Sequence, residues 1–121
     1  PQMVRTPPAD EVTVAAVEVS GTRIQAYSWR EVPAGKPLIS GEVTTTGPAT
    51  LVAFWWGDAG VRYQKTAAPD RGFRVIDSVL DAGALVQCAV AVKFEPVAGS
   101  YEVTWEATPS QGAQLWLVAI Q

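Results

Sequence analysis

The sequence contains no histidine and a single cysteine, Cys88, among its 121 residues. Without histidine, the chain lacks the usual general base near neutral pH, the Ser-His-Asp triads and the common zinc sites. One cysteine also excludes a disulfide within the chain. Apolar residues at Val86 and Val90 place Cys88 on an apolar strand face, where we expect it to be buried and unreactive. The sequence therefore predicts no enzyme, no catalytic residue, no metal site and no cofactor.

Clusters of positive charge and long apolar runs are also missing. The nine Lys and Arg residues are scattered and the net charge is -3, which argues against a nucleic-acid partner. No apolar run approaches the roughly 20 residues that cross a bilayer, so we expect no membrane insertion. No basic stretch leads into an apolar one, so the sequence predicts no signal peptide. We interpret the Pro-rich start at Pro1 as a natural mature end or as a linker of a longer chain.

Turn-forming residues divide the rest of the chain into short apolar segments. Gly, Pro and Asp recur between these segments, and no stretch shows a helical stripe bounded by caps. The pattern predicts an extended Pro-rich arm over residues 1–11 and a single domain over residues 12–121. For the domain it predicts an all-β fold, an antiparallel β-sandwich of jelly-roll type with about eight or nine strands. The expected strands are residues 12–19, 23–29, 38–43, 49–56, 61–64, 73–80, 84–95, 100–108 and 113–120, and residues 67–72 are expected to form a loop.

Alternation of apolar and polar residues predicts the core face of two neighbouring strands. Residues 100–108 place on one side Tyr101, Val103, Trp105 and Ala107. Residues 84–95 place on one side Val86, Cys88, Val90, Val92 and Phe94, and on the other side Gln87, Lys93 and Glu95. We expect these two strands to form a hairpin across residues 96–99, with both apolar faces in the core.

Two predicted strands, residues 49–56 and 113–120, are apolar on both faces. The adjacent residues Trp55 and Trp56 must point to opposite sides of a sheet. The outer face of a strand in a two-layer sandwich normally meets water, so a doubly apolar strand needs a cover. Loops or neighbouring strands, a subunit interface and an aromatic ligand platform are the three explanations left open. We take as ligand-binding or interface residues Trp29, Trp55, Trp56, Asp58, Arg62, Tyr63 and Trp116.

The aromatic residues are the only positive indication of a ligand. A sugar could stack on Trp55 or Trp56, while Asp58, Arg62 and Tyr63 on the adjacent turn bond its hydroxyl groups. We interpret the aspartates on the other turns as solvated turn residues rather than as a glycosidase pair or calcium ligands.

Four stretches of the chain resemble a known family. They are Gly-Pro-Ala-Thr-Leu-Val with Trp-Trp-Gly-Asp (47–58), Gly-Phe-Arg-Val-Ile-Asp (72–77), Ala-Gly-Ser-Tyr-Glu-Val-Thr-Trp (98–105) and Gln-Gly-Ala-Gln-Leu-Trp-Leu (111–117). Together they make residues 44–121 similar to a β-sandwich module in tail and other virion proteins of actinobacterial phages. Related-looking modules with a Gly-x-Tyr-x-Val-Thr-Trp strand also occur in bacterial surface proteins. The motifs mark turns and core positions, so the resemblance implies a fold and carries over no catalytic residue.

Two functions follow as expectations. The first is a non-catalytic phage virion structural or binding protein, either a minor tail protein or a capsid decoration, with a role in host adhesion. Its partners would be other virion subunits or further copies of itself in a homo-oligomer, and its location the virion. The alternative is a secreted carbohydrate-binding module of a bacterial surface protein, located outside the cell and bound to a cell-surface glycan.

Overall fold

The computed structural model describes residues 23–58, 64–84 and 86–121. Within these ranges the secondary structure consists of β-strands, with no helix. The all-β prediction is confirmed. Within the same ranges there is no helix long and apolar enough to span a membrane. The strands are β1 (Ile24–Val32), β2 (Leu38–Ile39), β3 (Val43–Thr45), β4 (Ala49–Gly57), β5 (Thr66–Pro69), β6 (Arg74–Val79), β7 (Gln87–Glu95), β8 (Gly99–Tyr101), β9 (Thr104–Thr108) and β10 (Ala113–Ile120).

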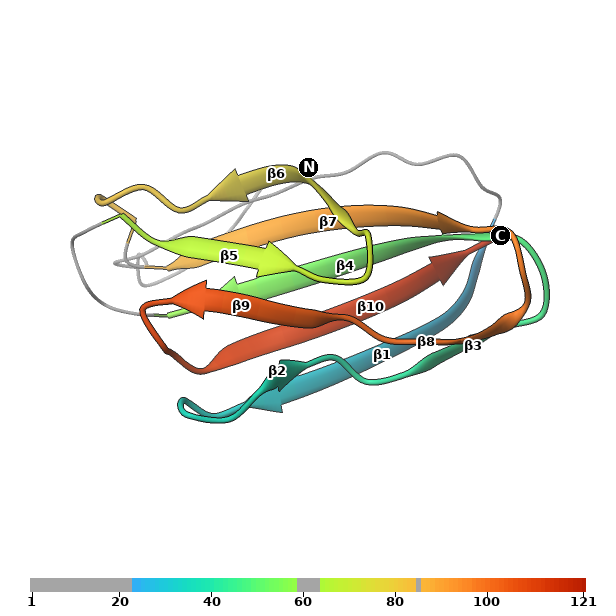
Figure 1. The fold of residues 1–121 in the computed structure, drawn as a ribbon, viewed down its shortest axis with the longest axis horizontal. Helices are drawn as coiled ribbons and strands as arrows, with labels where there is room; N and C mark the ends of the chain where they lie inside the picture. Colours follow the sequence, from blue (N-terminus) through green and yellow to red (C-terminus); the bar gives the residue numbers. More distant parts are fainter. Residues whose placement is uncertain (1–22, 59–63, 85) are drawn as a thin grey trace, which may run out of the picture.

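The strands form three sheets in which all neighbouring strands are antiparallel. A five-stranded sheet has the order β1-β10-β4-β7-β6, a three-stranded sheet the order β2-β9-β5, and a third sheet pairs β3 with β8. Figure 1 shows β2, β9 and β5 in front of the five-stranded sheet, with β3 and β8 continuing the front layer. The elements therefore pack as two layers, in the manner of a sandwich.

The predicted strands 38–43 and 100–108 are each interrupted, which raises the number of strands. At the interruption the backbone N–H of Ser40 donates to the carbonyl of Val103 at 2.8 Å, and the N–H of Val103 donates to Ser40 Oγ at 3.0 Å. A side-chain oxygen thus takes the place of a backbone carbonyl in the ladder. The two segments thus stay paired across the break, but the regular strands end on either side of it.

The hydrophobic core lies between the two layers and draws side chains from both. The five-stranded sheet contributes Leu51, Trp55, Leu115 and Leu117, all fully buried. The front layer contributes Trp105, whose ring centroid lies 6.4 Å from that of Trp55 at an interplanar angle of 32°. As predicted, Val103 and Trp105 are buried while Glu106 and Thr108 on the opposite side of the strand are exposed.

The predicted core face of residues 84–95 and the predicted hairpin are both wrong. Ala89 and Ala91 of β7 belong to the interior core, whereas Phe94 is 61% exposed. The small alanine side chains on the inner face leave room for the two large indoles of the core. The strands flanking residues 96–99 also pair in different sheets, because β7 pairs with β4 and β6 while β8 pairs with β3.

The predicted loop at residues 67–72 begins later than expected. Thr66–Pro69 forms β5, an edge strand paired with β9. Pro69 has no backbone N–H to donate, and it is tolerated here because it ends an edge strand. The turn follows at Asp70, whose Oδ1 accepts a hydrogen bond from the N–H of Thr104 at 2.8 Å. Of the other predicted elements, the arm 1–11, the strand 12–19 and residues 61–63 lie outside the described residues, and Gln64 is not in a strand.

Candidate functional site

The outer face of the five-stranded sheet, which points away from the interior core, is largely apolar. The strand register aligns Trp29, Trp116, Phe54 and Val90 in one row across β1, β10, β4 and β7. These residues alternate along their strands with core residues such as Trp55, so their side chains leave the opposite face of the sheet. The doubly apolar character predicted for residues 49–56 and 113–120 is therefore present in the fold.

Aromatic side chains gather on the half of this face formed by β1 and β10. Tyr27 is 67% exposed, Trp29 47% and Trp116 39%. The centroid of the Trp116 ring lies 6.0 Å from that of Tyr27 and 6.4 Å from that of Trp29. Both pairs are tilted, an arrangement that aromatic rings prefer to a face-to-face stack. Trp56 on β4, 48% exposed, is diagonal to Trp116 in the strand register. Tyr27, Trp29, Trp56 and Trp116 are here called the outer aromatic surface.

The remainder of the face is not uniformly exposed. Val52 on β4 and Val90 on β7 point outward but are each only 1% exposed, and neither belongs to the interior core cluster. The accessible aromatic rings thus lie beside a buried apolar centre. Exposed apolar side chains lie on both sides of this centre, with the aromatic group on β1, β10 and β4 and with Phe94, 61% exposed, on β7.

The predicted site residues separate into three groups. Trp56, Trp116 and Trp29 lie exposed on the outer face, and Asp58 is exposed just after β4. Trp55 is fully buried between the layers, which corrects its assignment as a ligand-binding or interface residue. The prediction that Trp55 and Trp56 point to opposite faces is confirmed. Arg62 and Tyr63 lie outside the described residues.

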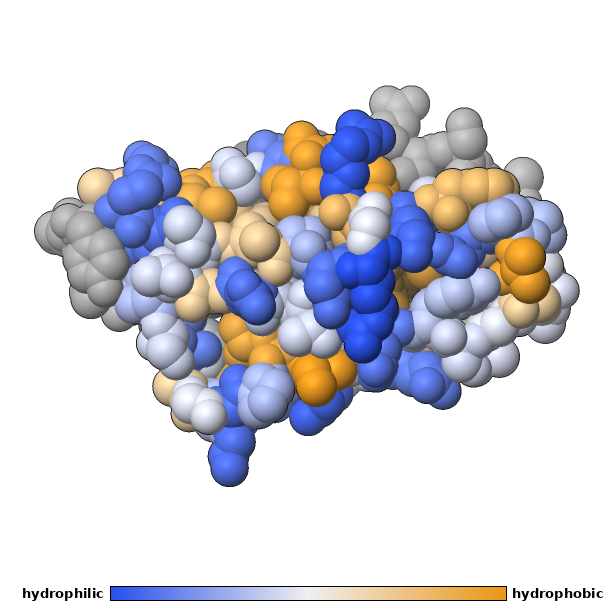
Figure 2. Space-filling view, in the orientation of Figure 1, coloured by the Kyte–Doolittle hydropathy of each residue, from blue (hydrophilic) through white to orange (hydrophobic). Residues whose placement is uncertain are grey.

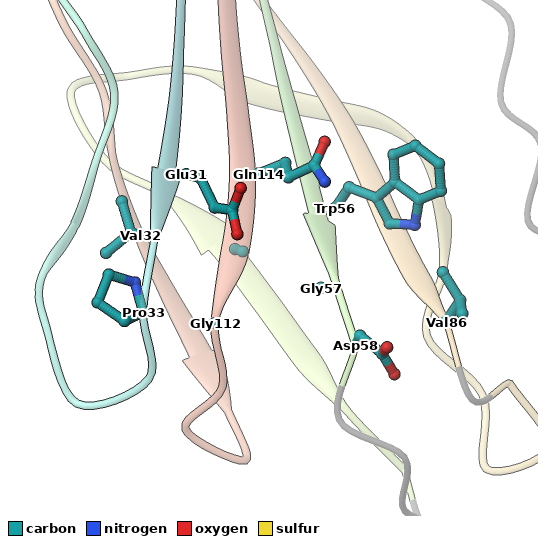
Figure 3. Close-up of a pocket in the computed structure, with 10 residues that line it drawn as sticks. Glu31, Val32, Pro33, Trp56, Gly57, Asp58, Val86, Gly112 and Gln114 are labelled. Atoms are coloured by element: carbon teal, nitrogen blue, oxygen red, sulfur yellow. The ribbon is translucent and has the colours of Figure 1, made fainter.

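Trp56 lines a cavity of about 420 Å³ at the end of the five-stranded sheet. The register places Glu31, Gln114 and Trp56 in one row across β1, β10 and β4, and Asp58 follows at the end of β4. Figure 3 shows the two carboxylates, the Gln114 amide and the Trp56 indole around this cavity. None of the described residues that line it is basic. The cavity combines the flat face of Trp56 with the carboxylate and amide groups of its other polar residues.

The described residues do not assemble a metal site, since no group of three or more His, Cys, Asp and Glu side chains among them could hold a metal ion. Cys88 lies opposite Trp56 in the register and is half-buried on the outer face rather than in the core. Burial raises the pKa of its thiol above the ordinary value. A backbone hydrogen bond with Val79 partly opposes this shift, and the Asp77 carboxylate adds to it.

Cys88 is expected to react with a thiol reagent several-fold more slowly in the native protein than in urea, because only the thiolate reacts and burial disfavours it. The folded-state pKa lies above the unfolded-state value, so ionisation also destabilises the fold as the pH rises beyond the unfolded pKa. Labelling rates measured against pH in native and unfolded protein check both points. A native rate that rises at the same pH as the unfolded rate would show that the thiol is freely solvated.

Two features of the structure were not predicted from the sequence. Trp105 and Gln111 line a groove between the β1–β2 turn, β5 and the end of β9. The ammonium of Lys65 is buried among backbone carbonyls of residues 81–84. Both features join segments that are far apart in the chain, and no local pattern signals them.

Comparisons with protein-family models, with curated proteins and with solved structures give no match for this chain.

Proposed function

We propose that this chain is a non-catalytic structural and binding protein of a bacteriophage virion, tail-associated or capsid-decorating, which assembles through its outer aromatic surface. The single observation that carries the proposal is the group of four exposed aromatic residues on one sheet face, Tyr27, Trp29, Trp56 and Trp116. Trp and Tyr are enriched in protein interfaces, and soluble monomers rarely expose a large contiguous apolar patch. The partner that fits best is a second copy of this chain or another subunit of the particle.

The order of the strands supports a jelly-roll reading of the fold. Strand pairs nest inward from the first and the last described strand: β1 pairs with β10, β2 with β9, and β4 with β7. Nested antiparallel pairs distributed over two layers are the arrangement of jelly rolls, which form many viral capsid and lectin domains. The innermost pair departs from this scheme, because β6 joins the edge of the five-stranded sheet at β7 and not β5.

Replacing Trp56 with serine is expected to weaken self-association about tenfold, in the range of a moderate interface residue. The indole is about half exposed, so its loss should leave the fold and thermal midpoint nearly unchanged. Sedimentation velocity over a concentration series measures the dissociation constant. The control is Val97→Ser, which removes another exposed apolar side chain, 65% exposed, in the turn after β7.

The outcomes of this experiment distinguish specific self-assembly from non-specific association and from glycan binding. A wild-type protein that stays monomeric at every concentration contradicts self-assembly. Equal weakening by Trp56→Ser and Val97→Ser would mean that general surface hydrophobicity drives association. A Trp56→Ser variant that assembles normally but loses a glycan would favour a different function.

The second candidate function is the secreted carbohydrate-binding module. The observation that favours it is the cavity at Trp56, where an exposed indole lies beside Glu31, Asp58 and Gln114. An aromatic face next to carboxylate and amide groups is suited to stacking on a sugar ring and bonding its hydroxyls. We rank it second because a single indole lines this cavity, whereas four aromatic residues make up the outer aromatic surface.

A further inference from the structure

The two outer surfaces of the sandwich meet water differently. Figure 2 shows the front layer, where hydrophilic residues interrupt the hydrophobic ones. The outer face of the five-stranded sheet instead carries an apolar strip along β4 and β7, here called the covered strip. Its residues point outward in the strand register but are buried or half-buried: Val52, Phe54, Cys88, Val90 and Val92. The covered strip therefore lies on the outside of the two layers and is still shielded from water.

Side chains of the sheet itself do not account for this shielding. Val52 is 1% exposed, yet its neighbours in the register, Val92 on β7 and Val118 on β10, are valines as well. Side chains of equal height do not shield one another on an open sheet face, which meets water. The larger rings beside the strip, Phe94 and Trp116, are themselves 61% and 39% exposed. The strip therefore needs a cover from another part of the chain.

The described strands do not provide the cover, because they belong to this sheet or to the layer on its other side. The parts of the chain outside the described residues are 1–22, 59–63 and 85. Residues 59–63 have to join the end of β4 to Gln64, which precedes β5 of the front layer. Residues 1–22 are joined to the described chain at one end alone. Their apolar part is residues 12–19, in which six of eight residues are Val or Ala.

We propose that residues 12–19 pack on the covered strip of their own chain and exclude water from it. They lead into Arg23, whose backbone pairs with Gln121 where β1 begins. The strand order places β1 about 12 Å from the line between β4 and β7. Residues 20–22, when extended, link Arg23 to Val19 over about 13 Å. Eight extended residues then span about 26 Å, which exceeds the distance of about 14 Å from Val52 to the level of Cys88.

The proposal goes beyond assembly through the outer aromatic surface and does not depend on it. The four aromatic residues of that surface lie to the side of the covered strip and are exposed. Residues 12–19 thus separate the outer face into a part that the chain covers by itself and a part that a second copy can reach. This assigns a cover to the centre of a face whose strands are apolar on both sides.

Cys88 provides a direct test, because it belongs to the covered strip and is the single cysteine of the chain. A second cysteine is introduced into the full chain by Val12→Cys, Val14→Cys or Ala16→Cys, and copper–phenanthroline is added as the oxidant. A disulfide requires the two Cα atoms to approach within about 7 Å. We expect at least one variant to form the disulfide within one chain at least tenfold faster than Val4→Cys, the matched control in the Pro-rich arm. Mass spectrometry and non-reducing electrophoresis identify the product.

Polar substitutions in the same segment give a second measurement. Residues 14 and 17 lie on opposite sides of an extended segment, so Val14→Asp combined with Val17→Asp directs one carboxylate toward the strip whichever side faces it. We expect a thiol reagent to label Cys88 at least threefold faster in this variant, at a temperature well below its thermal midpoint. The control Val4→Asp should label at the wild-type rate.

Three results would overturn the proposal. The first is that no cysteine variant within residues 12–19 forms a disulfide faster than Val4→Cys. The second is a disulfide that joins two chains at every protein concentration, which would mean that the segment covers the sheet of another copy. The third is a labelling rate of Cys88 that stays unchanged in the doubly substituted variant. Self-association is measured separately, so failure of this proposal leaves the test of assembly through Trp56 unaffected.

Discussion

Replacing Trp105 with alanine is expected to lower the free energy of unfolding by about 3 to 5 kcal/mol. Trp105 is 2% exposed and packs against Trp55 in the middle of the core. Strands β2, β5 and β9 form a small sheet whose other core side chains, such as Leu38 and Ala67, are much smaller. The indole is therefore the main apolar anchor of that sheet on the five-stranded sheet. Its removal leaves a cavity that backbone pairing over only a few residues cannot close.

Urea denaturation followed by circular dichroism measures this loss, with Trp29→Ala as the control. Trp29 is about half exposed on the outer face, so its replacement should lower the free energy of unfolding by less than about 1 kcal/mol. Equal losses in the two variants would contradict the assignment of Trp105 as the anchor.

The ends of β4 and β10 could be predicted closely because turn residues mark them. Residues 113–120 coincide with β10, and residues 49–56 fall one residue short of the end of β4 at Gly57. Gly57 is fixed by packing, since a Cβ at this position would lie 2.6 Å from the Trp55 ring. At Gly57 the turn signal in the sequence and the close packing in the fold therefore mark the same strand end.

The inner face of β7 could not be predicted because alternation favours neither side of the strand. Both faces are apolar, and the residues taken to mark the outer side are exceptions. Gln87 is fully buried with its Nε2 donating to the Ala84 carbonyl, and Lys93 lies 6.0 Å from the centre of the Phe73 ring. Which face is buried depends on the register with β4 and on the volume of Trp55, and both are properties of the assembled sheets.

The site residues show the same division between local and tertiary information. The opposite directions of Trp55 and Trp56 follow from strand geometry, but which of them is buried follows from the pairing of β4 with its neighbours. The partners of Trp116 on β1 come from the other end of the chain. Sequence patterns thus located the aromatic residues, and tertiary structure decided which of them form a common surface.

Replacing Lys65 with methionine is expected to lower the free energy of unfolding by about 1.5 to 3 kcal/mol, the range for hydrogen bonds of a charged group. The Lys65 side chain is 1% exposed, and its ammonium donates to the carbonyl oxygens of Asp81, Ala82 and Ala84. Methionine keeps most of the volume of the buried stem but donates no hydrogen bond. The carbonyls of residues 81–84 lose the group that holds them together, so the turn between β6 and β7 should loosen first.

Amide hydrogen exchange and urea denaturation together test this role of Lys65. The amide of Ala84, which donates to the Asp81 carbonyl at 3.1 Å, should exchange faster in Lys65→Met, while amides in the centre of β4 change only with global stability. The control Lys36→Met changes an exposed lysine and should stay within about 0.5 kcal/mol of the wild type. Burial of the ammonium carries a desolvation cost, and the described residues place no carboxylate within ion-pair distance to offset it. A Lys65→Met variant as stable as the wild type would therefore mean that this cost equals the hydrogen-bond gain, and that the turn is held by its own backbone.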